Sequence, residues 1–367
     1  MDNGEFIPIA EPDLGGNELR YVTDCIKSNW ISSLGDYNAR FEDEFSNYCK
    51  VDHSLAVFNG TVALHLALAA LGIKKGDETI LPDLTFAATA NAVSYVGASP
   101  VLVDVNKKNW TIDINQIEKS ITKKTKAIIA VHLYGHPCDM DPIMEIAKKH
   151  GLFVIEDAAE AIGAEYRGKK VGSMGDIGCF SFFGNKILTT GEGGMCTTND
   201  RSLAERMVFL RNHAMSNEKK YWHTEIGFNY RMTNIQAAIG LAQLERVDKF
   251  IEIKRKNARR YNDFLGKVKN IRLPAEEKWA KNVYWMYSIL TNRRDAVAKA
   301  LERKNVDSRP FFYPLHIMPP YLKRAACPVS EELSKKGLSL PSSTKLSDVQ
   351  ISYICKIISD VEKKIKK

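Results

Sequence analysis

A single lysine, Lys186, stands in a stretch that could make its side-chain amine a nucleophile. It follows the aromatic run 180–183 and precedes a glycine-rich turn that ends at Gly194. Apolar surroundings desolvate an ammonium group and lower its pKa, which makes the neutral amine available to attack a carbonyl carbon. The pattern therefore indicates a Schiff-base lysine. The alternative is an ordinary surface charge, which is what an isolated lysine most often is.

An acidic residue, Asp157, comes at the end of another apolar run, within 154–160. In open parallel α/β sheets, ligands bind beyond the carboxyl ends of the strands, so this position favours a functional role such as holding a proton on a ring nitrogen. Lys186 follows 29 residues later (186 − 157), one strand-and-turn excursion that could bring both to the same sheet edge. The alternative is that Asp157 caps a following helix.

The tripeptide Asn59-Gly60-Thr61 lies where an apolar run turns into a helical pattern. A glycine there lets backbone N–H groups approach an anion, and the helix N-terminus and the Thr61 hydroxyl add to the attraction. This predicts a phosphate site. The alternative is that Thr61 only caps the helix.

The elements that must position these residues alternate between strand and helix. This alternation is typical of an α/β fold with a mostly parallel sheet covered on both faces. The helix over 61–71 is apolar nearly all round and should be buried, whereas the helix over 142–149 has one apolar stripe. We expect strands at 55–58, 79–81, 101–103, 127–131, 152–155, 179–182 and 195–197.

The C-terminal part reads as a smaller α/β unit. The pattern predicts a long helix over 234–264, a strand at 285–290, a helix at 294–304, a strand near 306–309 and a last helix from Asp348. Residues 1–250 carry 26 Lys and Arg against 32 Asp and Glu, whereas residues 251–367 carry 26 against 12. The length of 367 residues and this charge asymmetry predict two domains, 1–250 and 251–367.

Composition and charge also limit the kinds of partner that we expect for the protein. The basic C-terminal part could attract nucleic acid or a phosphorylated small molecule, but no nucleic-acid-binding motif accompanies the charge, so we expect no nucleic-acid partner. The longest apolar stretch is too short for a membrane span and the N-terminus lacks a signal-peptide pattern, so we expect a cytoplasmic protein with no membrane partner. The seven cysteines are scattered and should be reduced. His132 and His136 flank a loop glycine, so no metal site is expected.

Five longer stretches resemble the sugar aminotransferase family that uses pyridoxal 5′-phosphate (PLP), the DegT/DnrJ/EryC1/StrS type of the aspartate-aminotransferase fold. They are NGTVALHLAL, DLTFAATANAV, DAAEAIGA, SFFGNKILTTGEGG and GFNYRMTNIQAAIGLAQLE, and the resemblance covers nearly the whole chain. Within the family, HLYGHPCDMDPI, SFFGNK and PLHIMPPY are most similar to GDP-perosamine synthases. Those enzymes transfer an amino group from L-glutamate to C4 of GDP-4-keto-6-deoxymannose, for O-antigen synthesis.

The resemblance also leaves alternatives open. One is an aminotransferase for a UDP- or dTDP-linked ketosugar. Another is a PLP-dependent sugar dehydratase, although the dehydratases of the family have His where this chain has Lys186. A third is a DNA-binding regulator built on the PLP fold, for which the chain has no room for an added helix-turn-helix module.

The resemblance assigns roles by position. It implies that Lys186 is joined covalently to PLP, that Asp157 pairs with its ring nitrogen and that Phe86 stacks on its ring. Glu160, where many members carry Gln, would lie near the phenolic oxygen of PLP. The phosphate would be bound by Gly60, Thr61, Ser181 and, from a second subunit of a homodimer, Asn229. Residue types add candidate contacts to the sugar nucleotide or to glutamate, since Arg offers a bidentate fork: Trp30, Ser32, Asn185, Arg231, Arg309 and His316. The alternative for Trp30 is packing.

Overall fold

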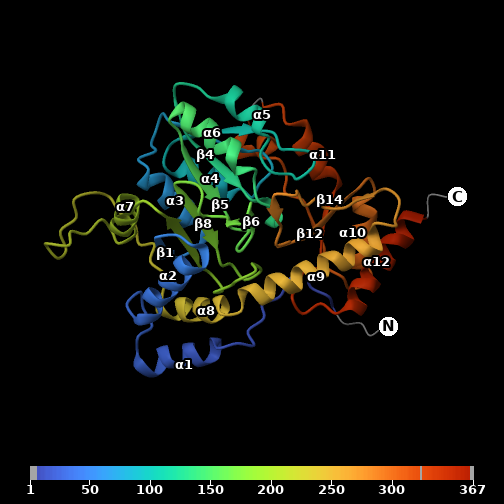
Figure 1. The fold of residues 1–367 in the computed structure, drawn as a ribbon, viewed down its shortest axis with the longest axis horizontal. Coiled ribbons are helices and arrows are strands. Elements are labelled where there is room, and N and C mark those ends of the chain that lie inside the picture. Colours follow the sequence, from blue (N-terminus) through green and yellow to red (C-terminus); the bar gives the residue numbers. More distant parts are fainter. Residues whose placement is uncertain (1–5, 323–324, 364–367) are drawn as a thin grey trace.

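A seven-stranded sheet forms the centre of the computed structural model, which describes residues 6–322 and 325–363 (Figure 1). The strand order is β1-β9-β8-β5-β4-β2-β3, with β9 antiparallel to both of its neighbours and the other pairs parallel. Each strand predicted between residues 55 and 197 is present. The strands are β1 (His53–Val57), β2 (Glu78–Pro82), β3 (Ser99–Val103), β4 (Thr125–Val131), β5 (Phe153–Asp157), β8 (Ile177–Ser181) and β9 (Gly194–Thr198).

Helices pack against this sheet. The predicted buried helix is α3 (Gly60–Ala70), and its residues 63–68 are all buried because no polar stripe exists to face solvent. The predicted striped helix is α6 (Met140–His150). The sequence pattern did not identify α1 (Glu18–Ser28) and α2 (Asp36–Cys49), which contact α8. The other helices here are α4 (Ala88–Tyr95), α5 (Ile114–Ile117) and α7 (Arg201–Arg211).

The prediction of one helix over 234–264 is wrong, because two helices occupy this stretch. They are α8 (Asn234–Leu244) and α9 (Val247–Leu265). At the break, Glu245 accepts a hydrogen bond from the Tyr21 hydroxyl at 2.6 Å, and Arg246 binds the Asp13 carboxylate at 3.0 Å. These ties to the N-terminal segment lie where the helix axis is interrupted, and α9 then runs to the C-terminal part (Figure 1).

The C-terminal part contains an antiparallel four-stranded sheet of order β10-β12-β14-β13. The predicted strand at 306–309 is reduced to β13 because Val306 instead bridges to Ile7. The elements are β10 (Ile271–Arg272), β12 (Tyr287–Thr291), α10 (Arg294–Glu302), β13 (Arg309–Pro310), α11 (Pro328–Lys336), β14 (Gly337–Leu340) and α12 (Asp348–Lys363). A third small sheet joins β11 (Ala280–Lys281), β6 (Glu165–Tyr166) and β7 (Lys169–Lys170).

All seven cysteines are free and buried, as predicted. Among residues 6–322 and 325–363, no helix is long and apolar enough to cross a membrane.

Candidate active site

The carboxyl ends of β5 and β8 bring the predicted lysine and acids together. These strands are parallel neighbours, with Asp157 opposite Cys179, so the turn after β8 lies beside the end of β5. Lys186 Nζ is 3.9 Å from Glu160 Oε1, and the side chains of both residues are largely buried. The Asp157 carboxylate is also close enough for its charge to favour the lysine ammonium. The arrangement places one amine near two acids at the sheet edge.

Burial favours the neutral form of Lys186, Glu160 and Asp157. It lowers the pKa of Lys186, with Glu160 and Asp157 opposing the shift and Arg309 adding to it. It raises the pKa of Glu160 to about 7 and also raises the pKa of Asp157, because both carboxylates lose water. At neutral pH, a larger fraction of Lys186 is therefore in the neutral amine form than of an exposed lysine.

Hydrogen bonds fix both carboxylates. Asp157 accepts from the Thr89 hydroxyl at 2.8 Å and from the Ala159 amide at 3.2 Å. Glu160 accepts from the Tyr134 amide at 2.7 Å. The residues after Asp157 form turns and no helix, so the helix-cap alternative does not apply.

The start of α3 and the end of β8 form a tight cradle suited to an anion. Asn59, not Thr61, caps α3, since its side chain accepts from the Val62 amide at 3.0 Å. A Cβ on Gly60 would lie 2.7 Å from the Cβ of Ser181, so only glycine allows this approach. The first helical amides have no intrahelical partner, and the Thr61 and Ser181 hydroxyls are polar groups beside them. The donor set fits a phosphate group.

Asn229 and Arg231 lie along the end of β1 in the same chain. Phe58 donates its amide to the Tyr230 carbonyl at 2.9 Å, and Val57 bridges to Arg231. Arg231 Nη2 donates to Asn229 Oδ1 at 3.1 Å, while Arg231 Nε is buried with no partner among the described residues. Asn229 itself is exposed.

The remaining predicted contacts are spread around this edge. Phe86 follows β2, is 60% exposed and packs on Phe312 with ring centroids 5.7 Å apart. Trp30 and Ser32 lie at the N-terminus of α8, where their carbonyls accept hydrogen bonds from the Asn234 side chain and amide. Arg309, in β13, is exposed.

The predicted substrate contact His316 is held by a carboxylate. Its Nδ1 lies 2.7 Å from Asp83 Oδ2, and its amide donates to Asp83 Oδ1 at 2.8 Å. His316 is only 8% exposed, and Cys327 lies beside the pair, with ligand-type atoms of the three within 4.8 Å of one another.

The two histidines considered from the sequence as a metal pair make separate contacts. His132 uses both ring nitrogens, toward Glu156 at 3.0 Å and the Cys138 amide at 2.9 Å. His136 contacts its own neighbour, the Pro137 carbonyl, at 2.7 Å.

Trp285 is a residue of the site that sequence reasoning missed. Its indole Nε1 donates to the Asn185 carbonyl at 2.8 Å, and Lys186 Nζ lies 3.8 Å from the centre of its ring. Trp285 comes about 100 residues after the lysine turn in the chain. No local motif links the two segments, so the sequence carried no signal for this contact.

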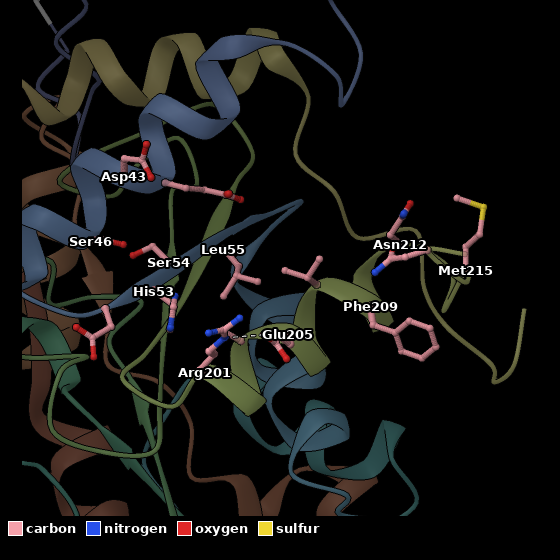
Figure 2. Close-up of a pocket in the computed structure, with 15 residues that line it drawn as sticks. Asp43, Ser46, His53, Ser54, Leu55, Arg201, Glu205, Phe209, Asn212 and Met215 are labelled. Atoms are coloured by element: carbon pink, nitrogen blue, oxygen red, sulfur yellow. Dashed lines mark hydrogen bonds and ion pairs between the residues drawn. The ribbon is translucent and has the colours of Figure 1, made fainter. Parts of the chain in front are cut away.

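Two concave regions differ in what lines them. A crevice beside Lys186 is lined by Asn185, Gln243, Lys254 and Ser343 among others. A separate pocket lies between α2, β1 and α7, and its lining includes Ser46, Ser54 and the ion-paired Arg201 and Glu205 (Figure 2). None of the residues predicted for the site lines this second pocket.

Comparisons with known proteins identify the family of the chain. GDP-perosamine synthases from Escherichia coli O157:H7 and from Caulobacter vibrioides are each 49% identical to this chain, over 97% of it and 98% of their own lengths. The solved PLP-form of Spr1654 from Streptococcus pneumoniae superposes with a TM-score of 0.93, at 27% identity, over 99% of this chain and 100% of that one. The profile of the DegT/DnrJ/EryC1/StrS aminotransferase family matches residues 12–359. The predicted α/β fold and the predicted family are confirmed, and the chain belongs to the DegT/DnrJ/EryC1/StrS aminotransferase family.

Proposed function

We propose that this protein transfers an amino group from L-glutamate to C4 of GDP-4-keto-6-deoxy-D-mannose, giving GDP-perosamine for surface polysaccharide synthesis. The observation that carries the proposal is the 49% identity, over almost the full length of both chains, to proteins named for this product. The presence of Lys186, rather than His, at the predicted Schiff-base position supports transamination over sugar dehydration.

PLP is the cofactor that we propose for the site. The amine of Lys186 near two carboxylates suits the aldehyde and ring nitrogen of PLP, and the cradle of Gly60, Thr61 and Ser181 suits its phosphate. Exposed Phe86 offers a ring face for stacking. When bound, PLP supplies an electron sink for the C–H bond that breaks in the substrate.

Two residues of the chain would then have separate roles: one supplies a charge and the other transfers a proton. Asp157, held by Thr89, would supply the negative charge that keeps the ring nitrogen of PLP protonated. Lys186, whose pKa is lowered by burial, would use Nζ to carry a proton from the donor carbon to the cofactor carbon, and in the opposite direction in the second half of the reaction. The same amine serves the glutamate and the ketosugar halves, so we expect ping-pong kinetics.

The proposal extends to the surroundings of the site. Asn229 would reach the phosphate of a partner subunit, so the active unit would be a homodimer in the cytoplasm. Each subunit would consist of domains 1–250 and 251–367. The sugar nucleotide and glutamate would be bound by residues from both domains, namely Trp30, Ser32, Asn185, Arg231, Arg309 and His316.

Mass spectrometry of products from a panel of GDP-, UDP- and dTDP-linked 4-ketosugars with glutamate tests the proposal. We expect an aminosugar, with nitrogen retained, from the GDP-linked substrate and far less from the others. Preferential amination of a UDP- or dTDP-linked sugar would overturn the assigned substrate. Release of ammonia with a deoxygenated sugar would overturn the assigned reaction.

A further inference from the structure

The indole of Trp285 touches the catalytic turn in two independent ways. It lies just before β12 and is only 5% exposed, so its ring is fixed by packing. Its N–H donates to the carbonyl of Asn185, the residue before the lysine, at 2.8 Å. Its ring face lies 3.8 Å from Lys186 Nζ, within the range of a cation–π contact. One side chain from the C-terminal part therefore contacts both the backbone and the amine of the turn.

The backbone that carries this indole is held from two sides. The Val283 amide donates to the Gly135 carbonyl at 3.1 Å. Gly135 has φ +100°, and a Cβ there would lie 2.9 Å from the Trp285 amide nitrogen, so this close approach requires glycine. On the other side, the buried Nζ of Lys254 donates to the Trp285 carbonyl at 3.3 Å. The indole thus has little freedom to move away from Lys186.

Trp285 is also linked to Glu160, through Tyr134. Its ring is stacked with Tyr134, with centroids 6.3 Å apart and planes inclined by 21°. Tyr134 adopts a left-handed backbone conformation, φ +53°, and donates its amide to Glu160 at 2.7 Å. A non-glycine residue in this region carries a conformational cost, which the stacking of the Tyr134 ring with Trp285 and with Phe312 helps to offset.

We propose that Trp285 is a positioning residue for Lys186: its N–H fixes the turn through the Asn185 carbonyl, and its ring face favours the ammonium form of the free lysine beside Glu160. This inference rests on the proposed function, in which Lys186 is the amine that transfers the proton. It adds to that function a residue from the C-terminal part that sets the charge state of the lysine.

The charges around Lys186 determine in which direction the loss of the Trp285 ring should shift the pKa of Lys186. Glu160 and Asp157 favour the ammonium, Arg309 opposes it, and burial lowers the pKa of Lys186. The ring face of Trp285 acts in the same direction as the two carboxylates. Removing the ring should therefore lower the pKa of the free lysine further, so that the lysine stays neutral, and active as a base, at lower pH.

The experiment compares the PLP-loaded wild type with Trp285→Leu, which removes the ring, and Trp285→Phe, which keeps a weaker ring face without the N–H. Trp279→Leu is the matched control, because Trp279 packs on His136 and Tyr166 instead. The first readout is the acidic limb of the pH profile for single-turnover reaction of the amino form with ketosugar, in which Lys186 is free. The second is the fraction of cofactor that borohydride links to Lys186, measured by peptide mass.

For Trp285→Leu we expect the acidic limb to move to lower pH by about 1.5 pH units, the size of a desolvated cation–π contact. Trp285→Phe should move it less, in the same direction, and both variants should trap less cofactor than the wild type. Trp279→Leu should leave both readouts unchanged.

An acidic limb at the wild-type position in either Trp285 variant would overturn the inference, as would an equal shift in Trp279→Leu. Should Trp285→Leu fail to fold, the Phe variant gives the answer alone. Failure of the proposed function gives a different result, since the wild type itself would then trap no cofactor on Lys186.

Discussion

Replacing Glu160 by Gln should flatten the pH dependence of stability between about pH 5 and pH 7. Burial raises the pKa of Glu160 from 4.5 to about 7, so the folded protein holds a proton that the unfolded chain has already released. The free energy of unfolding therefore falls as the pH rises through this window, by about 1.4 kcal/mol per pH unit and roughly 3 kcal/mol in all. Gln keeps the shape and can accept the Tyr134 hydrogen bond, but it does not titrate.

The assay is urea unfolding of the cofactor-free wild type and of Glu160→Gln at several pH values in this window. Replacing the carboxyl group by an amide beside Lys186 shifts the stability of the variant by an offset, so the slope of the difference between the two proteins is the informative quantity. Glu145→Gln, at an exposed position of α6, is the matched control and should give a flat difference. A flat difference for Glu160→Gln would refute the reasoning that burial sets the charge of this carboxyl group.

Three further substitutions test the roles of single groups. Lys186→Ala should abolish turnover and leave the circular dichroism spectrum unchanged, and multiple-turnover transamination by this variant would contradict its role. Asp157→Asn should retain the cofactor but lower kcat by roughly 100-fold or more, since about 3 kcal/mol of charged hydrogen bonding in the transition state is lost; near-normal rates would exclude the ring-nitrogen role. Gly60→Ala places a Cβ 2.7 Å from that of Ser181, and the resulting overpacking of about 1–3 kcal/mol should weaken PLP binding about tenfold or more in a fluorescence titration; unchanged affinity would argue against the phosphate cradle.

The sequence predicted the part of the site that depends on regular strands. The carboxyl ends of neighbouring parallel strands meet at one edge, so a lysine and an acid that each follow such a strand are brought together. Lys186 and Asp157 meet in this way because β5 and β8 are adjacent. The glycine at the strand-to-helix turn is also predicted from a local pattern, since a glycine there lets backbone N–H groups approach an anion, and the structure adds that Gly60 approaches Ser181 closely.

The features that the sequence did not predict depend on contacts between distant segments. The break between α8 and α9 occurs where Glu245 and Arg246 bind the N-terminal segment, which no helical periodicity encodes. The pairing of His316 with Asp83 spans 233 residues. The contact of Trp285 with the lysine turn likewise forms only when the two sheets are assembled. Local patterns cannot specify contacts of this kind.

The most direct test of the central claim is to load the protein with PLP, reduce it with borohydride and map the modified peptide by mass spectrometry. We predict that the cofactor mass is found on Lys186. Lys254 is a second buried lysine lining the same crevice, and it serves as an internal comparison. A colourless protein with no adduct, or an adduct on Lys254 in place of Lys186, would contradict the account.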